Sequence, residues 1–237
     1  MSHNSYARHS DARHSCSRHA VAASAHRPPP IFFAPLLCAL LLLALLAVPL
    51  AHADAAQQRI LVFGDSLSAA YRIPEESGWV ALLQRQLTED GLAHQVINAS
   101  VSGETTAGGL ARLPAMLETH RPDIVILELG GNDGLRGLPV SSIRQNLEQM
   151  IGLAQDSGAS VLLVGIQIPP NYGPRYTTPF YQQYQELADN HNLPLIPFLL
   201  EGIADNSALM QGDGIHPTAE AQPMIVDIVW PMLKEML

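Results

Sequence analysis

The chain has 237 residues and carries 13 Lys and Arg against 22 Asp and Glu, which gives a formal net charge of −9. Such an acidic surface repels the phosphates of nucleic acids and offers no basic patch for anionic lipid headgroups, so we expect no nucleic-acid partner. Both cysteines, Cys16 and Cys38, lie near the N-terminus, and the remaining chain therefore has no disulfide, thiolate metal site or cysteine nucleophile.

The first 53 residues have the layout of an export signal. Residues 1–30 are basic, residues 31–50 are almost wholly apolar, and Ala51-His52-Ala53 places small residues at both recognition positions of a cleavage site. We therefore predict cleavage after Ala53 and a periplasmic or secreted protein that has no stable membrane partner. Residues 54–237 are long enough for one domain. The alternative is an uncleaved anchor, since roughly 20 apolar residues can span a bilayer.

Beyond the leader, short apolar runs rich in β-branched residues alternate with stretches of helical spacing. The predicted strands are Ile60–Phe63, Val96–Ile97, Asp123–Leu129, Val161–Ile168 and Leu195–Phe198. The predicted helices are Trp79–Glu89, Thr106–Glu118, Ser141–Asp156, Pro179–Asn190 and Thr218–Leu237. This alternation predicts an α/β fold in which helices cover both faces of a five-stranded parallel sheet.

Polar residues follow several of the predicted strands directly. Ser66 follows the first strand, Gly103 the second and Asn132 the third, whereas Asp213 and His216 lie in the loop after the fifth. Ligands of open α/β sheets bind at the carboxyl ends of the strands. The sequence therefore predicts that these five residues, although far apart in the chain, meet at one edge of the sheet.

Serine, histidine and aspartate are the groups that nucleophilic acyl transfer requires. Ser66 lies at a strand-to-helix turn, where its hydroxyl can face a substrate. Asp213 precedes His216 by three residues, so its carboxylate can hold one ring nitrogen and leave the other for Ser66. Each motif alone also fits a simple structural role. Asp65 is interpreted as a helix cap and not as a catalytic acid, and Asp213 could equally cap a turn beside a surface histidine.

Gly103 and Asn132 supply candidate donors for an oxyanion. A glycine lets the main chain approach a ligand closely, and the Asn132 side chain can donate its amide N–H to the same oxygen. Taken singly, Gly103 could be an ordinary positive-φ turn residue and Asn132 the first residue of an Asx-turn. Only their combination with the serine, histidine and aspartate favours catalysis.

A metal site is the main chemical alternative at this edge of the sheet. Asp65, Asp133, Asp213 and His216 could all face one cleft. Because this set contains a single histidine and no cysteine, it would suit calcium better than catalytic zinc. We predict that the protein uses no metal and no other cofactor.

The four polar segments together resemble those of the SGNH, or GDSL, hydrolases, a family named after its serine, glycine, asparagine and histidine. The matching segments are Gly64-Asp65-Ser66-Leu67, Val101-Ser102-Gly103-Glu104, Gly130-Gly131-Asn132-Asp133 and Asp213-Gly214-Ile215-His216-Pro217. From about Ile60 to Pro231, the chain is similar to the exported bacterial thioesterases, lysophospholipases and arylesterases of this family. One departure is Ala70, where those relatives usually have glycine.

The resemblance implies a flavodoxin-like three-layer α/β/α sandwich and the hydrolysis of acyl esters and thioesters through an acyl-enzyme. It implies that Ser66 is the nucleophile, that His216 is the general base and acid, and that Asp213 orients the imidazole. The Ser66 and Gly103 N–H groups and the Asn132 amide would stabilise the oxyanion. The implied partner is a small-molecule acyl ester or thioester.

The loop of residues 134–138 follows the asparagine and is expected to contact the acyl chain. We predict that Gly134, Leu135, Leu138 and Ile215 bind substrate, although an ordinary strand-to-helix connection is equally compatible with this loop. Two other functions remain open, a carbohydrate O-acetylesterase of the same fold and a non-catalytic binding module.

Overall fold

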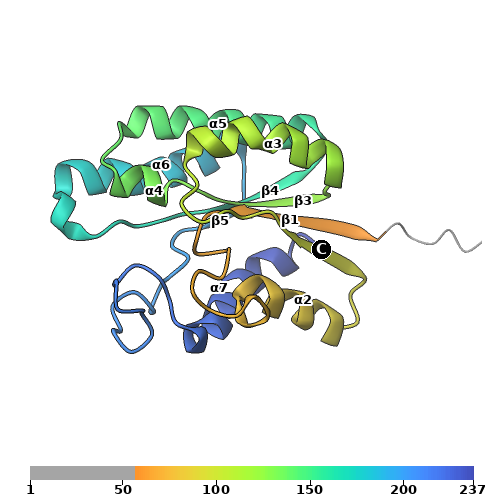
Figure 1. Ribbon diagram of the computed structural model, residues 1–237. Coiled ribbons are helices and arrows are strands. Elements are labelled where there is room, and N and C mark those ends of the chain that lie inside the picture. Colours follow the sequence, from red (N-terminus) through yellow and green to blue (C-terminus); the bar gives the residue numbers. More distant parts are fainter. Residues whose placement is uncertain (1–56) are drawn as a thin grey trace, which may run out of the picture. The chain divides into compact units, whose positions relative to one another are not determined.

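The computed structural model describes residues 57–237, in which a parallel sheet lies between two layers of helices (Figure 1). Its strands are β1 (Gln58–Gly64), β2 (His94–Asn98), β3 (Ile124–Glu128), β4 (Ser160–Val164) and β5 (Leu195–Ile196). They lie in the order β2-β1-β3-β4-β5, and all neighbouring pairs are parallel. The predicted fold class and all five strands are confirmed. The predicted export signal lies outside the described residues.

Helices cover both faces of the sheet, as the sequence predicted. In Figure 1, one layer above the sheet contains α3 (Thr106–His120), α5 (Val140–Asp156) and α6 (Pro174–His191). The layer below contains α2 (Trp79–Glu89) and α7 (Gln222–Lys234). The remaining elements are short: α4 (Gly131–Leu135) and the 3₁₀ turns η1 (Glu75–Ser77), η2 (Pro170–Tyr172) and η3 (Ala219–Ala221). None of the helices in residues 57–237 has the length and hydropathy needed to cross a bilayer.

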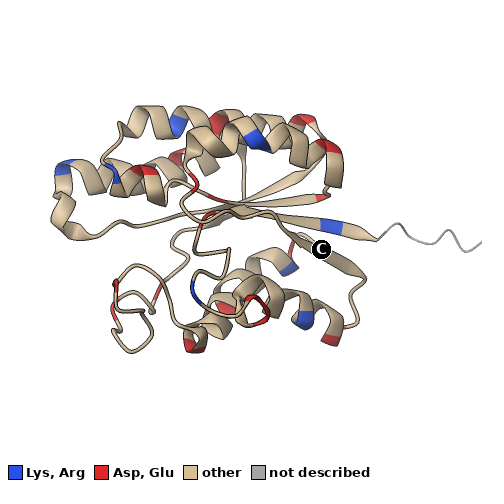
Figure 2. Cartoon of the chain, in the orientation of Figure 1, with Lys and Arg blue, Asp and Glu red and all other residues tan. Residues whose placement is uncertain are grey.

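The alternation of side chains along β1 explains why the domain has two hydrophobic cores. Leu61 and Phe63 pack into the core beneath α3, α5 and α6, whereas Ile60 and Val62 pack into the core on α2 and α7. Successive residues of a strand point to opposite faces, so an uninterrupted apolar run is required when both faces are covered. Figure 2 shows the complementary pattern, with charged residues mostly on the helices and loops.

Several element boundaries differ from the predicted ones. Helix α6 begins at Pro174, because Gly173 with φ +80° ends the preceding turn and proline suits a first helical position. The final helix begins only at Gln222, after the 3₁₀ turn η3. Strands β4 and β5 end at Val164 and Ile196, so the apolar residues that follow them are free to line a site.

Ala70 adopts a backbone conformation that favours glycine. Its φ is +54°, in the left-handed region, and Arg72 nearby has φ +57°. A residue with a Cβ adopts this conformation at a cost of roughly 1–2 kcal/mol. The turn after the nucleophile segment therefore favours glycine at this position, and alanine adopts this conformation with some strain.

Candidate active site

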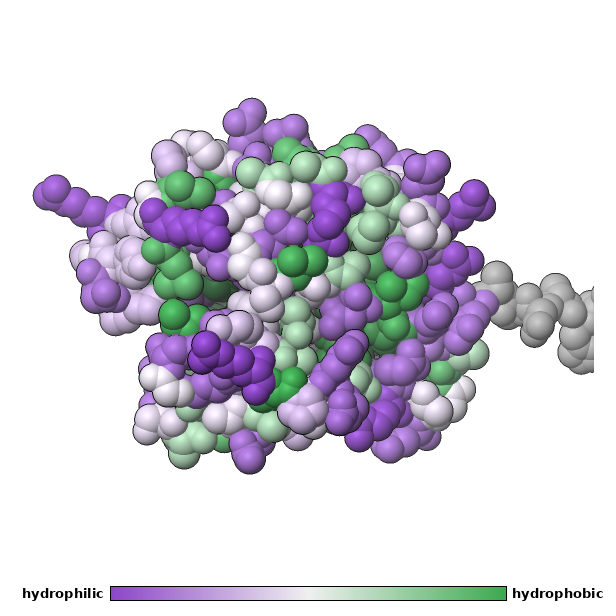
Figure 3. Space-filling model, in the orientation of Figure 1, coloured by the Kyte–Doolittle hydropathy of each residue, from purple (hydrophilic) through white to green (hydrophobic). Residues whose placement is uncertain are grey.

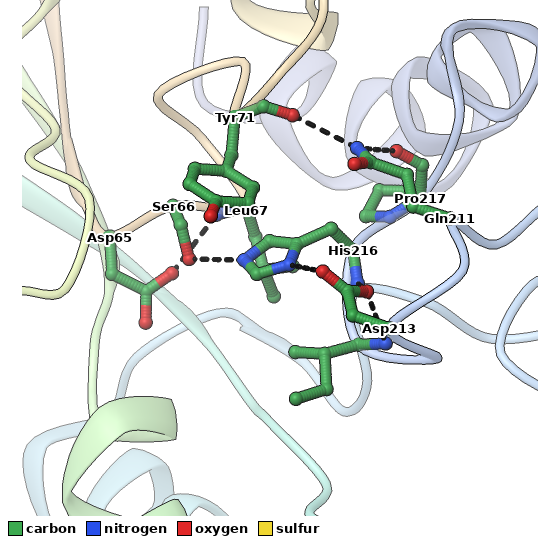
Figure 4. A network of polar contacts seen from close by, with 9 residues as sticks. Asp65, Ser66, Leu67, Tyr71, Gln211, Asp213, His216 and Pro217 are labelled. Atoms are coloured by element: carbon green, nitrogen blue, oxygen red, sulfur yellow. Dashed lines mark hydrogen bonds and ion pairs between the residues drawn. The ribbon is translucent and has the colours of Figure 1, made fainter.

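Ser66, His216 and Asp213 form a continuous chain of hydrogen bonds (Figure 4). The Ser66 Oγ lies 2.8 Å from His216 Nε2, and His216 Nδ1 lies 2.8 Å from Asp213 Oδ2. The other carboxylate oxygen of Asp213 accepts the backbone N–H groups of Ile215 and His216 at 3.0 and 3.1 Å. The structure thus brings together the three side chains that the sequence predicted, in the arrangement that nucleophilic catalysis requires.

The Asp213 carboxylate is held in its charged form. Partial burial raises its pKa, but the N–H groups of Ile215 and His216 and the His216 ring lower it more, to about 2. An ionised carboxylate accepts the Nδ1–H of the ring and so leaves Nε2 unprotonated and able to accept a proton from Ser66.

The loop that carries His216 is tied to the segment that carries Ser66. Gln211 Nε2 donates to the carbonyl oxygens of Tyr71 and Pro217 at 2.9 and 3.0 Å, and the Gln211 N–H donates to the His216 carbonyl at 2.7 Å. The Tyr71 ring packs against the His216 imidazole, with ring centroids 4.2 Å apart (Figure 4). No local sequence pattern marks Tyr71 or Gln211 as site residues, because the segments that they join lie far apart in the chain.

Three potential oxyanion donors line the same cavity as the nucleophile. The backbone N–H groups of Ser66 and Gly103 have no acceptor within residues 57–237, and Gly103 has φ +82° in a turn after β2. The Asn132 amide lies in α4 and donates one N–H to Asp65 Oδ2 at 3.0 Å. An amide nitrogen has two hydrogens, so the second remains for a ligand. All three donors therefore lie at the wall of the cavity and have an N–H available for a ligand.

The cavity beside Ser66 has a volume of about 560 Å³, and its wall is somewhat more apolar than polar. Leu135 and Ile215 line it, as predicted. Apolar residues that follow β4 and β5 also line it: Ile166, Ile168, Pro169, Phe198, Leu199 and Leu200. Of these, the sequence assigned Ile166, Ile168 and Phe198 to strands. Figure 3 shows hydrophobic side chains around a hollow on the side of the domain toward which the strands run.

Two residues predicted to bind substrate lie away from this cavity. Gly134 is buried, and a Cβ on it would lie within 2.8 Å of the side chains of Phe180 and Ile168. Leu138 is exposed, and its carbonyl oxygen accepts the Tyr176 hydroxyl at 2.6 Å. The prediction differed because it treated residues 134–138 as one open loop, whereas Gly134 and Leu135 belong to the short helix α4.

The side chains considered for a metal site do not form one ligand set. Asp133 faces away from the triad and accepts the N–H and hydroxyl of Thr106 at 2.8 and 2.7 Å. Asp65 accepts N–H groups of Leu67 and Asn132. In the described part of the chain, no group of three or more His, Cys, Asp or Glu side chains is placed to hold a metal ion.

Two carboxyl groups are buried behind the nucleophile turn. Asp65 is 2% exposed and Glu128 is 0% exposed. Burial raises the pKa of Asp65 to about 7, although hydrogen bonds from Leu67 and Asn132 oppose this effect. Burial and the nearby charge of Asp65 raise the pKa of Glu128 well above its usual value. The folded protein therefore binds protons at these groups more tightly than the unfolded chain does.

These shifts predict how the free energy of unfolding varies with pH. A carboxyl with a raised pKa contributes its full stabilisation below its unfolded pKa, which is 3.8 for Asp65, and this contribution is lost progressively as the pH rises from there to the folded value of about 7. The lowered pKa of Asp213 acts in the opposite sense, and its contribution is lost as the pH falls from about 4 toward 2. Urea denaturation should therefore show the highest stability near pH 4 and a decline as the pH rises above this value. Glu128→Gln should weaken the alkaline decline, and a stability that rises steadily from pH 6 to 9 would contradict this assignment.

The chain is similar to known proteins over most of its length. Residues 62–222 match the model of the GDSL-like Lipase/Acylhydrolase family. The chain is 51% identical over 191 residues to "Esterase TesA" of Pseudomonas aeruginosa, which covers 81% of this chain and 95% of that protein. It is 49% identical over 180 residues to an "Arylesterase" of Vibrio mimicus, with 76% and 90% covered. It is 42% identical over 190 residues to "Thioesterase 1/protease 1/lysophospholipase L1" of Escherichia coli K12, with 80% and 90% covered.

The fold agrees with a solved structure as well. The crystal structure of AlinE4, described as an SGNH-hydrolase family esterase, is 39% identical and superposes with a TM-score of 0.64. The match covers 76% of this chain and 97% of that one. Since the family model spans more than half of the chain and includes Ser66, Gly103 and Asn132, the protein belongs to the GDSL-like lipase/acylhydrolase family.

Proposed function

We propose that the protein hydrolyses carboxylic esters and thioesters of acyl chains through a covalent acyl-enzyme on Ser66. The observation that carries this proposal is the 2.8 Å contact between Ser66 Oγ and His216 Nε2 at the wall of an apolar cavity. The relatives named as an esterase, an arylesterase and a thioesterase and lysophospholipase support it. Aryl esters, lysophospholipids and acyl thioesters are therefore the substrate classes to test.

The geometry supports a two-step reaction. Ser66 Oγ bonds to the carbonyl carbon while its proton passes to His216 Nε2, and Asp213 stabilises the resulting imidazolium through Nδ1. The carbonyl oxygen becomes an oxyanion, which accepts hydrogen bonds from the N–H groups of Ser66, Gly103 and Asn132. The C–O or C–S bond then breaks, and His216 returns the proton to the leaving alcohol or thiol. A water molecule repeats these steps on the acyl-enzyme and releases the acid.

The cavity favours an acyl chain longer than acetyl. Each buried methylene contributes up to about 0.8 kcal/mol, provided that the pocket continues to enclose the chain. The cavity is lined by apolar residues after β4 and β5, together with Leu135 and Ile215. Both tryptophans, Trp79 and Trp230, lie on helices, and neither lines the cavity, so its wall offers no tryptophan on which a sugar could stack.

Activity on p-nitrophenyl esters should therefore increase from acetyl to medium-length acyl groups. Leu135→Ala should reduce the ratio of kcat/KM for octanoyl over acetyl, because Leu135 lines the cavity. Leu138→Ala is the matched control and should leave this ratio unchanged, because Leu138 is exposed and lies away from the cavity. A strong preference for acetyl esters, or activity confined to acetylated sugars, would favour a carbohydrate O-acetylesterase instead. A folded protein without activity on any ester would favour a binding module.

We further propose that the protein is exported and that a peptidase cleaves it after Ala53. The Ala51-His52-Ala53 site behind an apolar stretch supports this proposal. When the full chain is expressed in a Gram-negative host, the periplasmic fraction should contain a protein whose N-terminal residue is Asp54. A membrane-bound product that still contains residues 31–53 would support the uncleaved anchor.

A further inference from the structure

Asp65, the residue before the nucleophile, contacts a candidate oxyanion donor. Its Oδ1 accepts the Leu67 N–H at 3.0 Å, which is the capping role expected from the sequence. Its Oδ2 accepts Asn132 Nδ2 at 3.0 Å, although 67 residues separate the two in the chain. Asp65, Ser66, Gly103 and Asn132 all line the same cavity. The carboxylate therefore connects the nucleophile turn with α4.

A carboxylate partner decides which way an asparagine amide faces. An ionised carboxylate only accepts hydrogen bonds, so the amide must turn its NH₂ group and not its oxygen toward Asp65. One hydrogen of Asn132 Nδ2 then bonds to Asp65, and the other is left to donate into the cavity. In the opposite orientation, the amide oxygen would repel a developing oxyanion. The interaction with Asp65 thus selects the orientation in which Asn132 can assist the reaction.

The buried carboxyl pair indicates that the negative charge lies on Asp65. Both oxygens of Asp65 accept N–H groups, an arrangement that favours the ionised form. Glu128 Oε2 accepts the Asp65 N–H at 3.2 Å and the Ser68 hydroxyl at 2.7 Å. Glu128 Oε1 is buried and has no hydrogen-bond partner within residues 57–237. A buried negative charge on an oxygen without a hydrogen bond has a high energetic cost. Of the two carboxyl groups, Glu128 is therefore the one that retains its proton.

Two glycines make room for this arrangement. A Cβ on Gly131 would lie 3.2 Å from Asp65 Oδ2, closer than most Cβ contacts allow. A Cβ on Gly64 would lie 2.5 Å from Glu128 Oε2 and 2.9 Å from the Ser68 hydroxyl oxygen. Gly64 precedes Asp65, and Gly131 precedes Asn132. Because neither glycine has a Cβ, the carboxyl groups of Asp65 and Glu128 can lie close to the backbone of these two segments.

We propose that Asp65 is a positioning residue for the reaction, whose carboxylate holds the Asn132 amide in the orientation that donates to the oxyanion. This proposal rests on the function proposed above. A purely structural Asp65 would cap the nucleophile turn and affect catalysis independently of Asn132. The two roles differ in whether the effects of Asp65 and Asn132 are coupled.

A double-mutant cycle measures this coupling. Asp65→Asn should lower kcat for p-nitrophenyl octanoate by about 10- to 10²-fold, with little change in KM, because the loss cannot exceed that of the oxyanion donor itself. In an Asn132→Ala background, the same change should lower kcat by less than about threefold, because the amide that Asp65 orients is already missing. An equal loss in both backgrounds, or no loss in either, would overturn the proposal.

A second variant separates capping from positioning. Asp65→Ser keeps a side-chain oxygen that can accept the Leu67 N–H, but its shorter side chain does not reach Asn132. It should lose as much kcat as Asp65→Asn, and wild-type kcat in this variant would show that capping alone suffices. Thermal unfolding of each variant establishes that the measured protein is folded.

Glu128→Gln is the matched control for the loss of a buried carboxyl group. Its amide oxygen can still accept the Asp65 N–H and the Ser68 hydroxyl, so kcat should stay within about threefold of the wild type. If Glu128→Gln lost as much kcat as Asp65→Asn, the effect would belong to the buried pair as a whole and the proposal would be wrong. Ser66→Ala, measured in parallel, distinguishes a failure of the positioning role of Asp65 from a failure of the proposed hydrolase function. An inactive Ser66→Ala protein supports Ser66 as the nucleophile, whatever the result for the Asp65 variants.

Discussion

Replacement of Ser66 by alanine is expected to reduce kcat/KM for acyl esters by at least about 10⁴-fold, since this change removes the atom that forms the acyl-enzyme. The remaining oxyanion donors and the cavity can still bind an ester, but no covalent intermediate can form. Ser66 is only partly buried at the edge of the sheet, so the free energy of unfolding should change little.

The measurement is steady-state hydrolysis of p-nitrophenyl octanoate together with urea denaturation. Ser142→Ala, an exposed serine on α5, serves as a control and should retain full activity. Near-wild-type turnover by a folded Ser66→Ala protein would exclude the proposed mechanism. Hydroxylamine trapping of the acyl group should also fail in this variant, because trapping requires the acyl-enzyme.

Replacement of Asn132 by alanine is expected to lower kcat by about 10²- to 10³-fold, with a smaller effect on KM. The amide N–H interacts most strongly with the oxygen that is charged in the transition state, so its loss affects turnover more than substrate binding. Asn132 is in contact with Asp65, and thermal unfolding must therefore accompany the kinetics. A change confined to KM would indicate that Asn132 positions the substrate instead.

The sequence predicted the strands and most helices because their patterns are local. Helix α2 has the predicted bounds, Trp79–Glu89, and the apolar β-branched runs located all five strands. The ends of β4 and β5 were less predictable. The apolar residues after Val164 look like more strand in the sequence, but they leave the sheet and line the cavity. Helix α4 was missed because Gly131–Leu135 is short and too rich in glycine to show helical periodicity.

The predicted site residues meet because strand ends of a parallel sheet share one edge, a property that follows from strand assignment alone. The contacts that fix their geometry could not be predicted in the same way. Gln211 with Tyr71, and Asp65 with Asn132, join segments that are far apart in the chain. Such pairings depend on the tertiary arrangement of loops, and neither residue type nor spacing identifies the partner.

Identification of the residue that a fluorophosphonate modifies is a direct test of whether Ser66 is the nucleophile. The wild-type protein should lose activity in proportion to the incorporation of one adduct per chain, and peptide mapping by mass spectrometry should place this adduct on Ser66. Ser66→Ala should remain unlabelled under the same conditions, because no other serine is hydrogen-bonded to His216 in the described residues. An adduct on a different residue that tracks the loss of activity would contradict the account.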